Sequence, residues 1–139
     1  MIGYHNTCTQ ELKEIIKGHG DYAGIFVTLN ASHMQSSDYG DHCYRVTFDS
    51  ICELSDIEAY LETNTDFLIK HPKFLADCEE EAQDDNSYFE NQKLRALIAI
   101  ELGFDAIEEN DGILVVNGTV EYIGTKDSEA VEIEIEENY

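Results

Sequence analysis

The stretch that decides the fold is NQKLRALIAIELGFDAIEENDGILVV, residues 91–116. Its first half carries apolar side chains at helical spacing, namely Leu94, Leu97, Ile98 and Leu102. Gly103 then supplies a C-terminal cap, so residues 91–102 are predicted to form a helix. The second half changes to short β-rich runs, so this helix is predicted to lead directly into strands.

These C-terminal strands are short and are separated by turn residues. They are predicted at residues 104–108, 113–116 and 119–123. Turns are expected at Asn110-Asp111-Gly112 and at Asn117-Gly118, and Asn-Gly between two such runs is a strong hairpin signal. Residues 131–136 alternate Val or Ile with Glu, which is typical of a half-buried strand with a negative outer face.

The N-terminal half mixes the same two patterns. Strands are predicted at residues 2–8, 23–30 and 43–48; a helical turn or two at 9–17; and a short helix with a loop at 31–42. Residues 51–93 look mainly helical, with Ser55 and Glu58 spaced as a capping box. Because helices are flanked by several short strands, the fold class expected is α+β, as a single domain over residues 1–139.

Charge is the outlying property of the composition. Thirty Asp and Glu residues stand against eight Lys and Arg, which gives a formal net charge of −22. Such a field repels phosphate backbones and anionic membranes and speeds encounters with basic surfaces. We therefore expect a basic protein partner, with no direct nucleic-acid binding and no membrane contact. The plainer interpretation is a surface adapted for solubility or high salt.

Targeting and cysteine patterns point to the cytoplasm. The first residues lack the charged and apolar regions of a signal peptide, and no apolar run approaches the ~20 residues that span a bilayer. The cysteines form neither a Cys-x-x-Cys pair nor a Cys/His cluster at zinc spacing; they are Cys8, Cys43, Cys52 and Cys78. We expect them to be reduced, half-buried residues and expect no metal site.

Three groups of residues could carry chemistry. The first surrounds His5, the second runs from Tyr22 through Phe26 and Thr28 to Tyr39, and the third is Leu102-Gly103-Phe104 followed by carboxylates. Each group alone has a bland interpretation. A lone histidine usually serves surface or core packing, and aromatic residues at strand spacing usually belong to the core.

In this order and spacing, however, the groups resemble the ADP-ribosyltransferase fold, and more closely the phage-encoded ADP-ribosyltransferase-type anti-CRISPR proteins. The resemblance covers residues 2–49 and 94–123 and includes the stretches Gly40-Asp41-His42 and Tyr44-Arg45. It implies NAD as the cofactor. The residues it assigns to NAD binding are His5, Asn6, Thr7, Tyr22, Phe26, Thr28 and Tyr39, and the catalytic residues are Asp111 and His5. Glu108 and Glu109 compete with Asp111 for the catalytic position.

The implied chemistry suits these residue types. Cleavage of the nicotinamide–ribose bond builds positive charge on the ribose, and removing a fixed group that stabilises such charge commonly costs about 3–4 kcal/mol. His5 would act as a hydrogen-bonding clamp that positions the ribose. For the pyrophosphate, Arg45 and Arg95 are the best cations, and backbone N–H groups near Gly24 or at a helix N-terminus are the alternative.

The function this implies is a mono-ADP-ribosyltransferase that acts in the host cytoplasm. Its target would be a basic, nucleic-acid-binding component of a type I CRISPR surveillance complex. Two alternatives remain open. One is a non-enzymatic acidic decoy that mimics DNA through the acidic runs at residues 77–85 and 127–137 and plugs a channel in a restriction or CRISPR protein. The other is an accessory domain that keeps the fold without activity.

Overall fold

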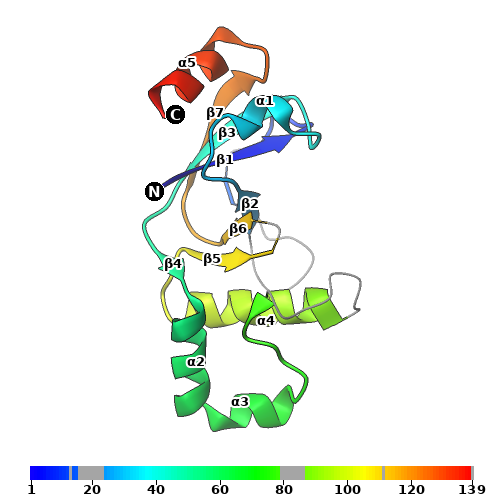
Figure 1. The fold of residues 1–139 in the computed structure, drawn as a ribbon, viewed down its shortest axis with the longest axis vertical. Helices are drawn as coiled ribbons and strands as arrows, with labels where there is room; N and C mark the ends of the chain where they lie inside the picture. The colour runs from blue at the N-terminus through cyan, green and yellow to red at the C-terminus, as the bar shows by residue number, and fades with distance from the viewer. Residues whose placement is uncertain (13, 16–23, 79–86, 111, 139) are drawn as a thin grey trace.

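The computed structural model describes residues 1–12, 14–15, 24–78, 87–110 and 112–138. Two small sheets organise these parts of the chain, and Figure 1 shows one near each terminus-bearing and helix-bearing half of the elongated molecule. One sheet has the strand order β1-β3-β7 and the other has the order β2-β6-β5-β4. The architecture is therefore α+β, as expected.

The β1-β3-β7 sheet is antiparallel throughout. Its strands are β1 (Ile2–Thr7), β3 (His42–Thr47) and β7 (Thr119–Thr125). The short helix α1 (His33–Ser36) and the C-terminal helix α5 (Glu129–Glu137) lie beside this sheet (Figure 1). Their buried residues form one core cluster with Tyr4 and Cys43.

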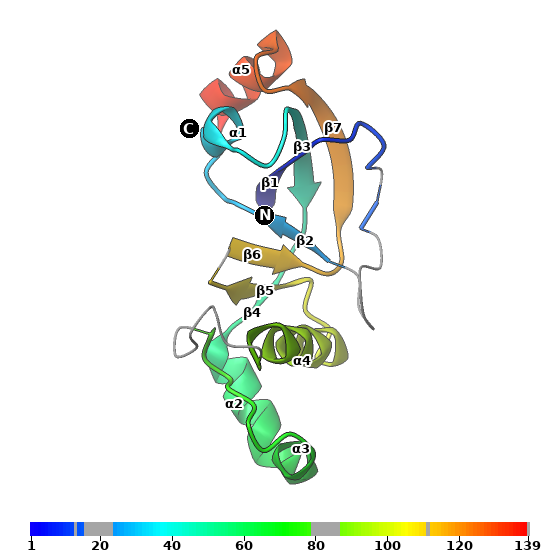
Figure 2. The ribbon, with the colours of Figure 1, turned by 90° about the vertical axis from the view of Figure 1, so that its right-hand side faces the viewer.

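The second sheet is mixed. Its strands are β2 (Ile25–Val27), β6 (Gly112–Val115), β5 (Ala106–Glu109) and β4 (Ile51–Cys52). Only the β4–β5 pair among these is parallel. Helix α4 (Ser87–Glu101) packs against the sheet, and α2 (Leu54–Thr63) and α3 (Thr65–Lys70) extend beyond it (Figure 2).

The two sheets meet where β1 passes β2. Tyr4 and Thr28 form an antiparallel bridge, with backbone N···O distances of 2.8 and 3.0 Å. Gly3 is required next to this bridge, because a Cβ there would lie 2.4 Å from the Val27 side chain. Val27, Val46 and their buried neighbours form a core cluster that spans both sheets. The bridge thus places β1 directly beside the second sheet.

Most of the predicted elements are confirmed with shifted ends. The strands at residues 2–8 and 43–48 and the helix at 91–102 correspond to β1, β3 and α4. Helix α2 begins earlier than predicted: its capping box is Glu53 with Asp56, not Ser55 with Glu58. The predicted helix at 9–17 is absent from its described part, residues 9–12 and 14–15, and the rest lies outside the described residues.

Two predictions from local pattern are wrong. The alternating segment at residues 131–136 is not a strand but part of α5, which Ser128 caps by accepting a hydrogen bond from the Val131 N–H. Asn117-Gly118 does not close a hairpin, since β6 and β7 belong to different sheets. The turn at Asn110-Asp111-Gly112 joins β5 to β6, which do pair as a hairpin.

Candidate functional site

His5 links the two sheets at the centre of the candidate site. It lies half-buried on β1, and its Nδ1 is 2.7 Å from the carbonyl oxygen of Phe26 on β2. Since a carbonyl can only accept, Nδ1 carries the proton and Nε2 holds the lone pair of the neutral ring. Burial lowers the pKa of His5, although the bond to Phe26 opposes that shift. His5 is therefore a neutral, oriented imidazole near pH 7.

Asn6 and Thr7 shape the polypeptide around this strand. The Asn6 amide is buried and donates to the carbonyls of Met34, at 2.8 Å, and of Gly40, at 3.1 Å. Gly40 has φ +150°, and a Cβ there would lie 2.2 Å from the backbone of Thr7. These contacts fix the segment after α1 against the end of β1, so Asn6 has a structural task here.

The predicted residues of the second group are placed apart from one another. Phe26 packs its side chain against the core cluster beneath α4, while its backbone carbonyl receives His5. Thr28 Oγ1 lies 3.2 Å from the His33 ring, and Tyr39 is 85% exposed. Tyr22 lies outside the described residues. The structure thus brings His5, Phe26 and Thr28 into neighbouring positions but does not bring Tyr39 to them.

The third group arrives through strand β6. Asp111 itself lies outside the described residues, but the next residue, Gly112, starts β6. A Cβ on Gly112 would lie 2.9 Å from the Val27 carbonyl oxygen, and Val27 pairs with Ile113. Strands β1, β2 and β6 are therefore consecutive neighbours. Segments separated by about a hundred positions in the sequence converge here.

Two further aromatic residues share the β1-β3-β7 sheet with His5. Tyr44 lies directly opposite His5 in the register, so their side chains are on the same face of the sheet. Tyr122 on β7 follows, with its ring centroid 5.2 Å from that of Tyr44 and its hydroxyl 2.9 Å from His42 Nδ1. Tyr122 is 40% exposed. Sequence reasoning missed Tyr122, because only the strand register reveals its alignment with His5.

The competing carboxylates have different surroundings. Glu109 is buried, and both of its oxygens accept hydrogen bonds from Arg95, at 2.7 and 2.8 Å. Glu108 is exposed. Glu109 is thus committed to an internal ion pair, and the choice of catalytic carboxylate narrows to Glu108 and Asp111.

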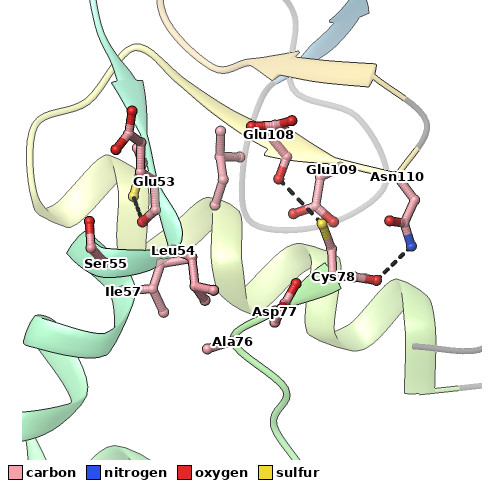
Figure 3. A pocket seen from close by; sticks show the side chains of 12 residues that line it. Glu53, Leu54, Ser55, Ile57, Ala76, Asp77, Cys78, Glu108, Glu109 and Asn110 are labelled. Carbon is pink, nitrogen blue, oxygen red and sulfur yellow. Dashed lines mark hydrogen bonds between the residues drawn. The ribbon is translucent and has the colours of Figure 1, made fainter. Parts of the chain in front are cut away.

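A cavity of about 490 Å³ lies on the other side of β5, at the carboxyl ends of β4 and β5 (Figure 3). Its lining includes Glu53, Cys78, Glu108 and Glu109, but none of the predicted NAD-binding residues. Burial, reinforced by nearby acidic groups, raises the pKa of the Cys52 thiol to about 12 and that of Cys78 to about 11. These thiols are protonated and unreactive at neutral pH.

The two arginines considered for the pyrophosphate are both paired. Arg45 contacts Glu134, at 2.6 Å, and Glu121, at 2.9 Å. The Tyr4 hydroxyl lies 3.4 Å from Glu134, and burial together with that carboxylate raises the pKa of Tyr4 to about 12. Arg95 is fully buried against Glu109. Neither arginine is placed to receive a phosphate without giving up a carboxylate.

Comparisons with known proteins identify the fold. A solved structure described as the crystal structure of an anti-CRISPR protein superposes with a TM-score of 0.61 and 23% sequence identity. The match covers 88% of this chain and 95% of that chain. No family model matches the sequence, and no curated protein matches it. The chain therefore shares its fold with that anti-CRISPR protein over nearly its whole length.

The same described residues were searched for membrane and metal features. None of the helices in these ranges combines the length and apolar character needed to cross a bilayer. No group of three or more His, Cys, Asp or Glu side chains within these ranges is arranged to hold a metal ion.

Proposed function

We propose that this chain inhibits CRISPR immunity as an NAD-dependent mono-ADP-ribosyltransferase that modifies a basic, nucleic-acid-binding subunit of a CRISPR complex. The observation that carries the proposal is the convergence of β1, β2 and β6. It sets the oriented His5 beside the strand that begins immediately after Asp111. The fold shared with an anti-CRISPR protein supports the biological part of the proposal.

The residues around His5 suit the ribose and nicotinamide of NAD. With Nδ1–H held by Phe26, the Nε2 lone pair of His5 is available in chemical type to accept a hydrogen bond from a ribose hydroxyl. Tyr122, on the same sheet, offers an exposed aromatic ring. NAD would supply the ADP-ribosyl group, and a carboxylate from Asp111 or Glu108 would stabilise the positive charge that develops on the ribose.

The pyrophosphate fits less directly. Because Arg45 and Arg95 are engaged with carboxylates, backbone N–H groups are the better candidates for receiving it. His5 would hold the ribose in place, and its low pKa keeps it from acting as a cationic partner for phosphate at neutral pH.

The acidic surface suits a basic target. Helix α5 exposes several carboxylates to solvent: Glu129, Glu132, Glu136 and Glu137. Its last turn contains no basic residue, although the helix dipole favours cations there. A surface that holds such charge against local preference is suited to attract a positively charged protein and to raise the association rate.

Label transfer tests the enzymatic proposal. The purified protein is incubated with adenine-labelled NAD and a lysate from CRISPR-bearing bacteria, alongside the variants His5→Ala and Asp111→Ala. We expect a labelled protein band with the wild type and a loss of at least about 100-fold with Asp111→Ala. Glu121→Gln, an exposed carboxylate on β7, serves as the control and is expected to leave labelling unchanged.

The second candidate is a non-enzymatic acidic decoy, which the exposed glutamates of α5 favour. It predicts that inhibition of the CRISPR nuclease survives His5→Ala and Asp111→Ala, requires no NAD and disappears at high salt. Inhibition that depends on NAD and on Asp111 would reject the decoy. Inhibition that is independent of both would reject the enzyme.

A further inference from the structure

Arg95 and Glu109 form a buried ion pair that joins helix α4 to the end of strand β5. The two side chains are 1% and 0% exposed, and Arg95 Nε and Nη2 donate to separate oxygens of Glu109. Arg95 Nη1 also donates to the Leu75 carbonyl, at 2.7 Å. A guanidinium held at three points by acceptors fixes both position and orientation, because its donors form a rigid planar fork.

This pair is one of several contacts that hold the segment leading into Asp111. The Asn110 side-chain amide donates to the Cys78 carbonyl at 2.6 Å, and the Cys78 thiol donates to the Glu108 carbonyl at 3.7 Å (Figure 3). Beyond Asp111, Gly112 resumes strand pairing opposite Glu109. Three consecutive residues before Asp111 are therefore tied to α4 or to the Cys78 segment.

Stability alone is a poor explanation for such a pair. Well-packed apolar residues often replace buried ion pairs with no loss of stability, since removing two charges from water offsets their attraction. What an apolar pair lacks is direction: it cannot hold the β5 terminus in one register against α4. The location of the pair, two residues before the proposed catalytic carboxylate, gives that direction a use.

We propose that Arg95 and Glu109 are positioning residues that set the placement of the Asp111 carboxylate for transfer of ADP-ribose. This inference rests on the proposed function. It also gives Arg95 a role different from phosphate binding: the guanidinium acts through the β5–β6 turn and not on the cofactor.

The experiment compares Glu109→Asp with Glu134→Asp. Each change keeps a charge and withdraws the carboxylate by one methylene, and each affects a carboxylate that Arg95 or Arg45 grips through both oxygens. Glu134 lies on α5 beside the other sheet, so it is the matched control. Initial rates of label transfer from NAD are measured over a range of NAD concentrations, and amide hydrogen exchange is measured on the same samples.

For Glu109→Asp we expect kcat to fall by about 10–100-fold with KM for NAD within about threefold of wild type. Exchange is expected to speed up locally at residues 108–113. Glu134→Asp is expected to keep kcat within about twofold and to leave exchange at that turn unchanged. Arg95→Lys, which keeps the charge without the fork, is the second variant and should repeat the Glu109→Asp result.

An unchanged kcat in both folded Arg95–Glu109 variants would overturn the inference, as would an equal loss in Glu134→Asp. A wild type that transfers no label rejects the proposed function itself, and with it the catalytic consequence. The exchange measurement still decides whether the ion pair holds the turn, so the two failures are distinguishable.

Discussion

Replacing Glu109 with Gln should be among the most destabilising single changes of a charged residue in the described structure. The change keeps the size of the side chain but leaves the Arg95 guanidinium without a counter-charge in a site where both side chains are almost fully buried. Breaking such a pair by removing one partner costs about 3–5 kcal/mol. For a chain of this length, that corresponds to a fall in Tm of about 10–15 °C.

The matched change is Glu121→Gln. Glu121 also pairs with an arginine, Arg45, but its side chain is 66% exposed, and exposed pairs contribute below about 1 kcal/mol. Urea unfolding followed by circular dichroism gives both free energies. The double variant with Met at positions 95 and 109 should be less destabilised than Glu109→Gln alone, because no uncompensated charge remains. Equal costs for Glu109→Gln and Glu121→Gln would refute the reasoning.

Further predictions concern backbone strain, protonation and thiol reactivity. Gly40→Ala should cost about 2–4 kcal/mol in urea unfolding, because φ is +150° and the new Cβ would meet backbone at 2.2 Å; Gly103→Ala, at φ +83° with open space, should cost about 1 kcal/mol. Because the folded pKa of His5 lies below its ordinary 6.5, the unfolded chain binds the proton more readily, and stability falls as pH drops below about 6.5. His5→Gln should reduce that fall in a Tm series from pH 7.5 to 5; identical slopes would contradict the assignment. With a thiol reagent at pH 8, exposed Cys8 should react first, whereas Cys52, with its pKa near 12, should react only on unfolding; rapid labelling of Cys52 in native protein would count against its burial.

The tail shows why local pattern could not supply the whole fold. The alternation of residues 131–136 fits a strand, yet the segment is helical because Ser128 caps it and Val131 and Glu134 are buried three positions apart. Glu134 then contacts Arg45 on β3. That contact joins positions 89 apart in the chain, so no local window contains the information that selects the helix.

For the candidate site, residue types were more informative than residue roles. The segments around His5, Phe26 and the start of β6 converge, as the resemblance implied, and this follows from strand pairing that the sequence suggested only in part. The role given to Arg95 could not be foreseen: a cation in an acidic chain suggests a ligand for phosphate. Its burial depends on Glu109, whose side chain turns inward because β5 alternates between faces.

The strand order of the two sheets has a consequence for how this chain reaches its native state. The chain alternates between them, contributing β1, then β2, then β3, then β4 to β6, and finally β7. No contiguous piece therefore contains a complete sheet, and the β1-β3-β7 sheet closes only when residues from both halves are present. Such interleaving favours late, all-or-none folding at a rate limited by distant pairings. A ribosome would have to release nearly the entire chain before the first sheet could be completed.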